Sequence, residues 1–409
     1  MFDNDEIIEK VILFAADTEN GDNINDNLDE LEELVKTAGA VVVGRMIQKK
    51  EHIDNATYLG SGKVLELADM VVLLGATGVI CDDELSPMQL TNLERSLDTK
   101  IMDRTMVILD IFASRANTRE GKIQVELAQL KYRSSRLIGM RSSLSRLGGG
   151  IGTRGPGEKK LEIDRRVIRD RISQLSKELS DVKQHREVMR KQRMEGNLPI
   201  VSIVGYTNAG KSTLLNHLTH AGVLEEDKLF ATLDPTSRNY KLSNGQEIII
   251  TDTVGFIKKL PHHLINAFRS TLEEAKYADI ILHVVDASNI HADTQILTVY
   301  ETLKGLGVTD KPVITAFNKI DKLDEMPILK DLSADYTVNI SAKKEIGFDN
   351  LSDILGEVIN KSRSYIEKVI PYTDAGLLNR IHKSGTIIEE EYREDGIYIR
   401  AYIDKNLGI

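Results

Sequence analysis

One loop in this chain combines the residue types that bind phosphate groups. It reads Gly205-Tyr206-Thr207-Asn208-Ala209-Gly210-Lys211-Ser212 and fits the pattern G-x-x-x-x-G-K-[ST]. Glycines let backbone N–H groups surround phosphate oxygens, Lys211 can neutralise the outer phosphates, and Ser212 can offer an oxygen to Mg²⁺. An apolar run precedes the loop and helical spacing follows it, so an accidental glycine-rich turn is the weaker interpretation. The loop is therefore predicted to be a P-loop.

A second motif, Asp252-Thr253-Val254-Gly255, is expected to complete the phosphate end of the site. Asp252 can hold a water bound to Mg²⁺. The Gly255 N–H can contact the γ-phosphate, which would make the following segment a switch. Between the two motifs lies Phe230-Ala231-Thr232-Leu233-Asp234-Pro235-Thr236. A threonine in this stretch should complete the Mg²⁺ shell when GTP is bound, and we choose Thr232, with Thr236 as the alternative.

A third motif, Asn318-Lys319-Ile320-Asp321, predicts which base is bound. Guanine presents its N1–H and 2-amino group side by side, so the Asp321 carboxylate can accept both. Adenine lacks these donors, and ATP would leave a desolvated carboxylate unpaired, which disfavours an ATP-driven enzyme. Ser341-Ala342-Lys343 follows another expected strand and would contact guanine through a main-chain N–H. The motifs together predict a GTP site.

These residues have three expected roles. The catalytic residues are Lys211, Thr232 and Gly255, and the Mg²⁺ ligands are Ser212 and Thr232, with Asp252 acting through a water. The expected GTP-contacting residues are Gly205, Tyr206, Thr207, Asn208, Ala209, Gly210, Lys211, Ser212, Thr213, Phe230, Ala231, Thr232, Leu233, Asp234, Asp252, Thr253, Val254, Gly255, Asn318, Lys319, Ile320, Asp321, Ser341, Ala342 and Lys343.

Two residues bear on the rate of hydrolysis. Phe256 follows Gly255, and its ring cannot orient an attacking water as a glutamine could, so we expect slow hydrolysis unless a partner orders the switch segments. Asn208 occupies the P-loop position where some potassium-activated GTPases carry a cation-binding asparagine. The alternative interpretation of Asn208 is an ordinary polar loop residue, and both remain open. The expected cofactors are thus Mg²⁺ and, on the first interpretation, K⁺.

The elements that must position these motifs form a doubly wound α/β domain, placed at residues 198–365. Expected strands are Pro199 to Val204, Gln246 to Thr251, Asp279 to Val285, Pro312 to Phe317 and Tyr336 to Ile340, with helices between them. A hairpin turn is expected at Asn244-Gly245. Alternation of strands and helices at this spacing predicts a mostly parallel sheet with the motifs at strand ends.

A basic helical hairpin is predicted at residues 113–197. One apolar stripe comprises Val167 or Ile168, then Ile172, Leu175, Leu179, Val182 and Met189, and a shorter one comprises Ile123, Leu127, Leu130 and Leu137. Six glycines and a proline between Leu147 and Gly157 cannot continue a helix, so this stretch becomes the tip between two antiparallel helices. Residues 131–194 hold 18 Lys and Arg against 7 Asp and Glu, a net charge of +11, which leaves −21 elsewhere.

Two smaller regions flank these. Residues 1–112 are expected to form an α/β domain with strands at Val11 to Ala15 and Ala40 to Gly44 and a helix at Asp26 to Ala38. Val71 to Leu74 is either a strand or the end of a helix that begins near Lys63. Residues 366–409 are expected to form a small α+β segment, with a helix at Asp374 to His382 and strands at Thr386 to Glu391 and Gly396 to Ile403.

The composition of the whole chain limits which class of protein it can be. It has 409 residues, 41% of them hydrophobic, and a net charge of −10, which argues against nucleic-acid binding over the entire surface. The lone cysteine, Cys81, is expected to be a small core residue. Met1 to Lys10 lacks the pattern of a signal peptide, and no apolar run approaches the roughly 20 residues that span a bilayer. We expect a cytoplasmic protein, monomeric, without a membrane span.

Several segments resemble one family. Gly149-Gly150-Ile151-Gly152-Thr153-Arg154-Gly155-Pro156-Gly157-Glu158, then Leu161-Glu162 and Asp164-Arg165-Arg166, resemble the signature of the HflX family of GTPases. So do Leu109-Asp110-Ile111-Phe112-Ala113, Gln124-Val125-Glu126-Leu127-Ala128-Gln129-Leu130 and Thr57-Tyr58-Leu59-Gly60-Ser61-Gly62-Lys63, and the segment Phe230 to Thr236 is similar to the family's switch I. The chain departs from the family at Lys159-Lys160, where threonine and glutamine are usual, and this adds positive charge.

The resemblance implies a partner, the large ribosomal subunit including its RNA. In that family the helical region and its tip enter the peptidyl-transferase area, and the protein can split stalled ribosomes. The expected function is therefore a ribosome-associated GTPase that cycles between GTP and GDP, with RNA contacts from Arg141, Arg146, Arg154, Lys159 and Lys160. A switch in ribosome assembly, or one that binds a protein partner through the hairpin, remains the alternative.

The assignment of guanine makes Asp321 the residue to test. An Asp321→Asn change replaces one carboxylate oxygen with an amide that faces the two guanine donors, so GTP binding should weaken by about tenfold or more. Equilibrium binding of a fluorescent GTP analogue measures the effect, and a variant that binds GTP as the parent does would contradict the guanine assignment.

Overall fold

The computed structural model describes residues 8–18, 23–145, 156–194, 198–219, 229–259, 274–325 and 329–403. The chain forms two compact units, which are described separately. One unit comprises Met1–Asp181 with Lys228–Phe230 and Lys259–Phe268, and the other comprises Val182–Asp227, Ala231–Lys258 and Arg269–Ile409. Two short pieces of the central sequence thus belong with the N-terminal residues.

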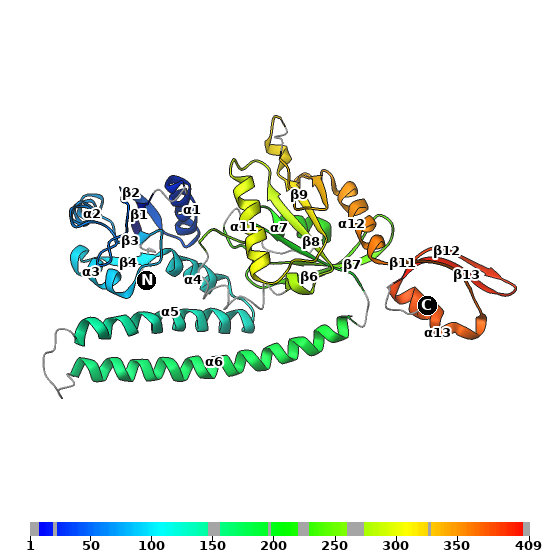
Figure 1. Cartoon of the computed structure of the whole chain (residues 1–409), viewed down its shortest axis with the longest axis horizontal. Helices are drawn as coiled ribbons and strands as arrows, with labels where there is room; N and C mark the ends of the chain where they lie inside the picture. Colours follow the sequence, from blue (N-terminus) through cyan, green and yellow to red (C-terminus); the bar gives the residue numbers. More distant parts are fainter. Residues whose placement is uncertain are drawn as a thin grey trace, which may run out of the picture. The chain divides into compact units, whose positions relative to one another are not determined.

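A four-stranded parallel sheet forms the centre of the N-terminal α/β fold (Figure 1), in the order β2-β1-β3-β4. Its strands are β1 (Lys10–Asp17), β2 (Val41–Lys49), β3 (Gly78–Cys81) and β4 (Lys100–Asp103), and its helices are α1 (Ile24–Thr37), α2 (Ser61–Leu74), α3 (Pro87–Leu97) and α4 (Arg104–Arg115). Val71 to Leu74 therefore ends a helix, the second of the two interpretations. Cys81 is fully buried among apolar residues, as predicted.

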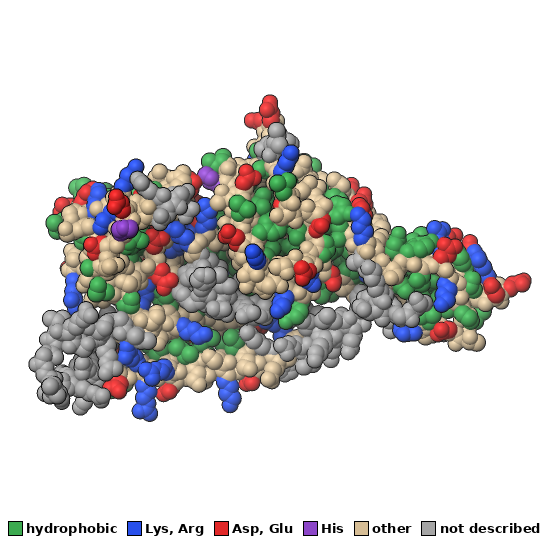
Figure 2. Space-filling view, in the orientation of Figure 1, with side chains coloured by type: hydrophobic (Ala, Val, Ile, Leu, Met, Phe, Trp, Pro, Cys, Tyr) green, Lys and Arg blue, Asp and Glu red, His purple; other side chains and the backbone are tan. Residues whose placement is uncertain are grey.

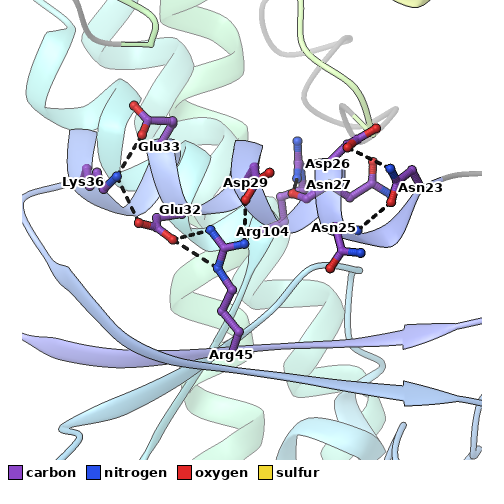
Figure 3. A network of polar contacts seen from close by, with 10 residues as sticks. All are labelled: Asn23, Asn25, Asp26, Asn27, Asp29, Glu32, Glu33, Lys36, Arg45 and Arg104. Atoms are coloured by element: carbon purple, nitrogen blue, oxygen red, sulfur yellow. Dashed lines mark hydrogen bonds and ion pairs between the residues drawn. The ribbon is translucent and has the colours of Figure 1, made fainter. Parts of the chain in front are cut away.

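Local polar contacts set where these helices begin. Ser86 and Gln89 form a capping box at α3, and Asp103 accepts from the Met106 N–H at the start of α4. Figure 3 shows how α1 is held over the sheet: Arg45 of β2 contacts Glu32 and Asp29, with its Nη1 2.5 Å from an Asp29 oxygen. The pKa of Glu32 is lowered mainly because Arg45 stabilises the carboxylate.

The predicted helical pair is present as α5 (Arg119–Ser145) and α6 (Pro156–Met194), which lie side by side in Figure 1. They run antiparallel, because Arg171 contacts Glu126 while Arg165, nearer the start of α6, donates to the Leu137 carbonyl. Their seam is apolar and holds Ile123, Leu127, Leu130, Ile172, Leu175 and Leu179. Of the two residues offered for the start of the stripe, Ile168 is half-buried and Val167 is exposed, so Ile168 belongs to the stripe. Most of the predicted tip lies outside the described residues.

The domain after the hairpin has a six-stranded sheet in the order β10-β9-β8-β5-β7-β6. The strands are β5 (Ile200–Gly205), β6 (Thr236–Lys241), β7 (Glu247–Asp252), β8 (Ile280–Asp286), β9 (Val313–Asn318) and β10 (Tyr336–Asn339). All neighbours pair in parallel except β6 and β7, which are joined by the predicted turn, where Gly245 has a φ of +83°. The predicted doubly wound, mostly parallel sheet is confirmed.

Helices cover this sheet and bury its apolar strands. They are α7 (Lys211–Thr219), α10 (Glu274–Tyr277), α11 (Ala292–Gly305) and α12 (Phe348–Ser362), with a short 3₁₀ turn, η1 (Ile320–Lys322), after β9. The core combines residues of β5, β7, β8 and β9 with leucines of α7 and α12, such as Leu214 and Leu351. The loops that follow the buried parallel strands emerge at the carboxyl ends of those strands.

The C-terminal segment is a three-stranded antiparallel sheet packed on one helix. Its order is β11-β13-β12, with β11 (Ser364–Ile370), β12 (Thr386–Arg393) and β13 (Gly396–Ile403), and the helix is α13 (Ala375–Ser384), preceded by the 3₁₀ turn η2 (Tyr372–Asp374). The helix and two of the strands match the expectation, and β11 is an additional strand. Among the described helices of the chain, none has the length and apolar character to cross a bilayer.

The apolar seam of the hairpin gives a stability prediction. Leu175 is 1% exposed, so Leu175→Ala should leave a cavity between α5 and α6 and destabilise the pair by about 2–5 kcal/mol. Urea-induced loss of the helical circular dichroism signal measures this. Val167, 61% exposed on the same helix, provides the matched control. Val167→Ala should change stability by less than about 0.5 kcal/mol, and equal effects of the two changes would contradict the seam.

Candidate nucleotide-binding site

The predicted P-loop lies between the end of β5 and the start of α7, at the carboxyl edge of the sheet. Two of its glycines are required by space and backbone. Gly205 has a φ of +154°, and a Cβ there would lie 2.2 Å from the Val284 carbonyl oxygen. Gly210 has a φ of +96°, and a Cβ there would lie 2.2 Å from the Asn318 amide nitrogen. These close approaches explain both glycines of the motif.

Lys211, the first residue of α7, is buried beneath this loop. Its ammonium donates to the Tyr206 carbonyl at 2.7 Å. Burial lowers the pKa of Lys211 to about 8, although the nearby Asp252 carboxylate opposes the shift. A phosphate group beside the ammonium would add negative charge and favour its protonated form, so the residue fits the role of a phosphate ligand.

Three oxygens gather next to the P-loop. The Ser212 hydroxyl lies 2.8 Å from the Thr232 hydroxyl and donates to an Asp252 carboxylate oxygen at 2.9 Å, and Thr232 donates to that same oxygen at 3.0 Å. The other Asp252 oxygen, Oδ1, is buried and has no hydrogen-bond partner among the described residues. Burial raises the pKa of Asp252, and Lys211 opposes this shift. The alternative threonine, Thr236, instead opens β6.

Gly255 and Phe256 fold back against the P-loop. A Cβ at Gly255 would lie 2.9 Å from the Lys211 ammonium nitrogen and from the Thr207 Cα, so any larger residue would displace the loop. The Phe256 N–H donates to the Gly205 carbonyl at 3.1 Å, and the Phe256 carbonyl accepts from the Thr207 N–H at 2.8 Å. The Phe256 side chain is itself buried, at 2% exposure. Its ring therefore packs as a core residue.

The residues predicted to select the base meet at the ends of β9 and β10. Asn318 donates to the Ala209 carbonyl at 2.9 Å and accepts from the Ala342 N–H at 2.8 Å. The Ser341 hydroxyl donates to an Asp321 oxygen at 2.6 Å, which lowers the pKa of Asp321 and fixes the orientation of its carboxylate. Ala342 belongs to the segment Ser341–Lys343, one main-chain N–H of which is predicted to contact guanine, and its own N–H donates to Asn318.

Three contacts of this site were missed by the sequence reasoning. Lys319 forms an ion pair with Asp286 at 2.7 Å and donates to the Asn208 carbonyl at 2.7 Å. The position of Asp286 directly after the apolar run of β8 is a signal that could have found it. The Tyr206 hydroxyl accepts from the Lys258 N–H at 2.8 Å, and no sequence pattern indicates this contact.

The other predicted contact residues lie on these same loops or beside them. Thr253 donates to the Ile203 carbonyl at 2.7 Å, and Val254 and Leu233 are buried. Phe230 packs within the N-terminal unit, where its ring meets Phe112 edge to face. The side chains of the predicted RNA contacts Arg141, Arg146, Arg154, Lys159 and Lys160 lie outside the described residues.

Models of known families match three stretches of the chain. Residues 25–113 match a "GTP-binding GTPase N-terminal" region, and residues 115–193 match a "GTP-binding GTPase Middle Region". Residues 200–319, which carry the P-loop and end at Lys319 within the predicted base-selecting motif, match a "50S ribosome-binding GTPase". The matches cover the N-terminal fold, the hairpin and most of the nucleotide-binding domain.

Individual relatives align over nearly the full chain. A GTPase HflX of Lacrimispora saccharolytica is 63% identical over 98% of this chain and 95% of its own length, and that of Escherichia coli is 39% identical over 97% and 93%. A crystal structure of a GTP-binding protein from Sulfolobus solfataricus with GDP is 25% identical, covers 87% of this chain and 99% of its own, and has a TM-score of 0.45. Identity of this extent, together with the P-loop site, shows that the chain belongs to the HflX family of GTPases, which hydrolyse GTP.

Proposed function

We propose that this GTPase binds the large ribosomal subunit, hydrolyses GTP to GDP and phosphate in the cytoplasm, and acts in the splitting and rescue of stalled ribosomes. The observation that carries the proposal is that one chain contains both a GTP site and a basic helical hairpin. A site built for GTP is covalently joined to a hairpin whose residues 131–194 have a net charge of +11 in a chain of net charge −10. The 50S ribosome-binding GTPase family matched by residues 200–319 supports the same partner.

For the nucleotide we propose the following roles. Lys211 and the P-loop amides bind the phosphates, Gly255 contacts the γ-phosphate, and Asp321 binds guanine. The Ser212, Thr232 and Asp252 oxygens fit Mg²⁺, because they lie within 3.0 Å of one another and Asp252 retains a buried oxygen without a partner. Mg²⁺ bound there would neutralise the charge that develops on the phosphates.

We further propose that the isolated chain hydrolyses GTP slowly. Phe256 occupies the position after Gly255, and its ring is buried. A buried ring offers no polar atom to orient the attacking water. A ribosome that orders the segments around Thr232 and Gly255 would supply what the isolated chain lacks. Hydrolysis would then act as a timer for release.

The hairpin is the proposed RNA contact. Figure 2 shows Lys and Arg side chains, in blue, projecting from the described part of α6. Arg166 has 85% of its side chain exposed and lies 4.0 Å from Asp170, so its charge is only weakly compensated. Ordered RNA is recognised largely by shape and backbone contact, which suits a basic helical pair.

One observation favours a second candidate. Ile163 and Val167 are 62% and 61% exposed on the same helix, which suits an apolar contact with a protein. On this alternative the chain is a GTP-dependent switch that binds a protein partner through the hairpin, or acts in ribosome assembly. Salt dependence separates RNA from an apolar protein interface.

Ribosome binding should depend on the nucleotide. The chain with a non-hydrolysable GTP analogue should cosediment with purified large subunits, and the chain with GDP should not, because GTP orders both switch segments. The same subunits should accelerate hydrolysis, which without them stays below about 1 s⁻¹.

Salt is the control for this measurement. If RNA is the partner, the affinity should fall as the salt concentration rises. For each phosphate neutralised, the logarithm of the association constant should fall by roughly one per tenfold rise in salt. Equal sedimentation with both nucleotides, or none with either, would contradict the ribosome proposal, and a salt-independent complex would favour the protein partner.

A monovalent cation is the last proposed component. Asn208 is exposed on the P-loop, and its φ of +59° is one that asparagine tolerates well. We propose that its side chain helps to bind K⁺ beside the phosphates. Hydrolysis should be several-fold faster in KCl than in NaCl at equal ionic strength, and the difference should vanish in Asn208→Ala. Equal rates of the parent in both salts would leave Asn208 as an ordinary polar loop residue.

A further inference from the structure

Five consecutive residues, Gly255–Lys259, lead from the nucleotide site directly into the N-terminal unit; we call them the strap. Gly255 lies against Lys211 and Thr207 of the P-loop. Lys258 still belongs to the nucleotide-binding unit, whereas Lys259 groups with the N-terminal residues. The strap is therefore a short covalent route along which one unit can influence the other.

The first part of the strap is fixed to the P-loop. Phe256 makes two backbone hydrogen bonds with the loop, as described above. The Lys258 N–H donates to the hydroxyl of Tyr206, whose side chain is only 5% exposed. A displacement of Lys258 would therefore break a hydrogen bond made by a P-loop residue.

The far end of the strap is held by two consecutive carboxylates that follow β3. The Lys259 ammonium lies 2.5 Å from an Asp82 oxygen and 2.7 Å from an Asp83 oxygen. Asp82 is fully buried and also contacts Arg104 at 2.9 Å, while Asp83 accepts from the Tyr58 hydroxyl. Burial disfavours the charge on Lys259, but the two carboxylates outweigh it and raise its pKa.

Lys259 also has an unusual backbone conformation. Its φ is +52°, in the left-handed region that a lysine rarely adopts. Such a conformation persists only where surrounding contacts compensate for its cost. The ion pairs with Asp82 and Asp83 are the described contacts of the Lys259 side chain, so they are the interactions that can hold the strap in this form.

The segment before Thr232 is attached to the same unit in a similar way. Phe230 has a φ of +54°, and its ring centroid lies 4.7 Å from that of Phe112. The Leu229 N–H donates to the Thr37 hydroxyl at 3.3 Å. Two residues further along, Thr232 lies in the oxygen cluster proposed for Mg²⁺. The contacts of Leu229, Phe230 and Lys259 are thus all present in a structure in which Thr232 and Gly255 both lie at the nucleotide site.

We infer that Lys259 is a positioning residue for GTP, and that the Asp82–Asp83 pair of the N-terminal unit acts through it. The pair holds the strap so that Gly255 is placed for a γ-phosphate, which makes the N-terminal unit favour GTP over GDP. The inference rests on the proposed contact between Gly255 and the γ-phosphate, and is independent of any role at the ribosome. GDP lacks a γ-phosphate and does not use Gly255, so its affinity is the internal reference.

The experiment compares the full-length parent with Lys259→Gln, which removes the charge and keeps a polar side chain that is one atom shorter. Equilibrium binding is measured for a non-hydrolysable GTP analogue and for GDP, both with Mg²⁺. The analogue should bind about tenfold more weakly to the variant, a typical size of coupling between sites, while GDP affinity stays within about twofold. Lys259→Arg keeps the charge and should restore most of the preference.

Two further variants keep the test decisive. Asp83→Asn removes one carboxylate at a half-buried position and should shift the preference for GTP over GDP in the same direction but by less. This variant still tests the inference if Lys259→Gln fails to fold. Lys100→Gln breaks an exposed ion pair with Glu9 in the same unit, and should leave both affinities unchanged. An equal loss for both nucleotides, an unchanged ratio, or a stronger effect on GDP would overturn the inference.

Discussion

The nucleotide site depends on one buried amide at the end of β9. Asn318 donates to the P-loop at Ala209 and accepts from Ala342, so it joins the loop for phosphate to the loop for the base. Gly210 leaves the space this amide needs. An aspartate could not donate to Ala209, and an apolar residue would leave both partners buried and unpaired, at about 1–3 kcal/mol each. Asn318 therefore fixes the phosphate loop and the base loop relative to each other.

The sheet explains why such a contact can form. From β5 the chain proceeds to β7 on one side, and later to β8, β9 and β10 on the other, so the P-loop emerges where the order of strands reverses. Loops diverge at such a point and leave a crevice at the carboxyl ends of parallel strands. Asp252, Asp286 and Asn318 each end a neighbouring strand there. The topology thus gathers residues that are far apart in the sequence.

The sequence predicted these strand ends because each follows a continuous apolar run and carries a short polar motif. It did not predict β4 or β11. Lys100 to Asp103 is too short to show a period, and β11 carries Glu367 and Lys368 on exposed positions that resemble a loop. Side-chain partners such as Asp82 for Lys259 depend on tertiary packing, and local spacing contains no information about them.

Non-glycine residues with positive φ lie near both ends of the site and are held by different parts of the chain. Among the described non-glycine residues with positive φ, Lys319 lies in the predicted base-selecting motif, Asn208 lies on the P-loop, and Phe230 and Lys259 flank the phosphate loops. Lys319 is held by Asp286 at the end of β8 and by the Asn208 carbonyl of the P-loop, both within the nucleotide-binding unit. Phe230 and Lys259 are held instead by residues of the N-terminal unit. A left-handed conformation costs a non-glycine residue about 1 kcal/mol or more, so Phe230 and Lys259 keep it through contacts with the N-terminal unit, whereas Lys319 keeps it through contacts within the nucleotide-binding unit.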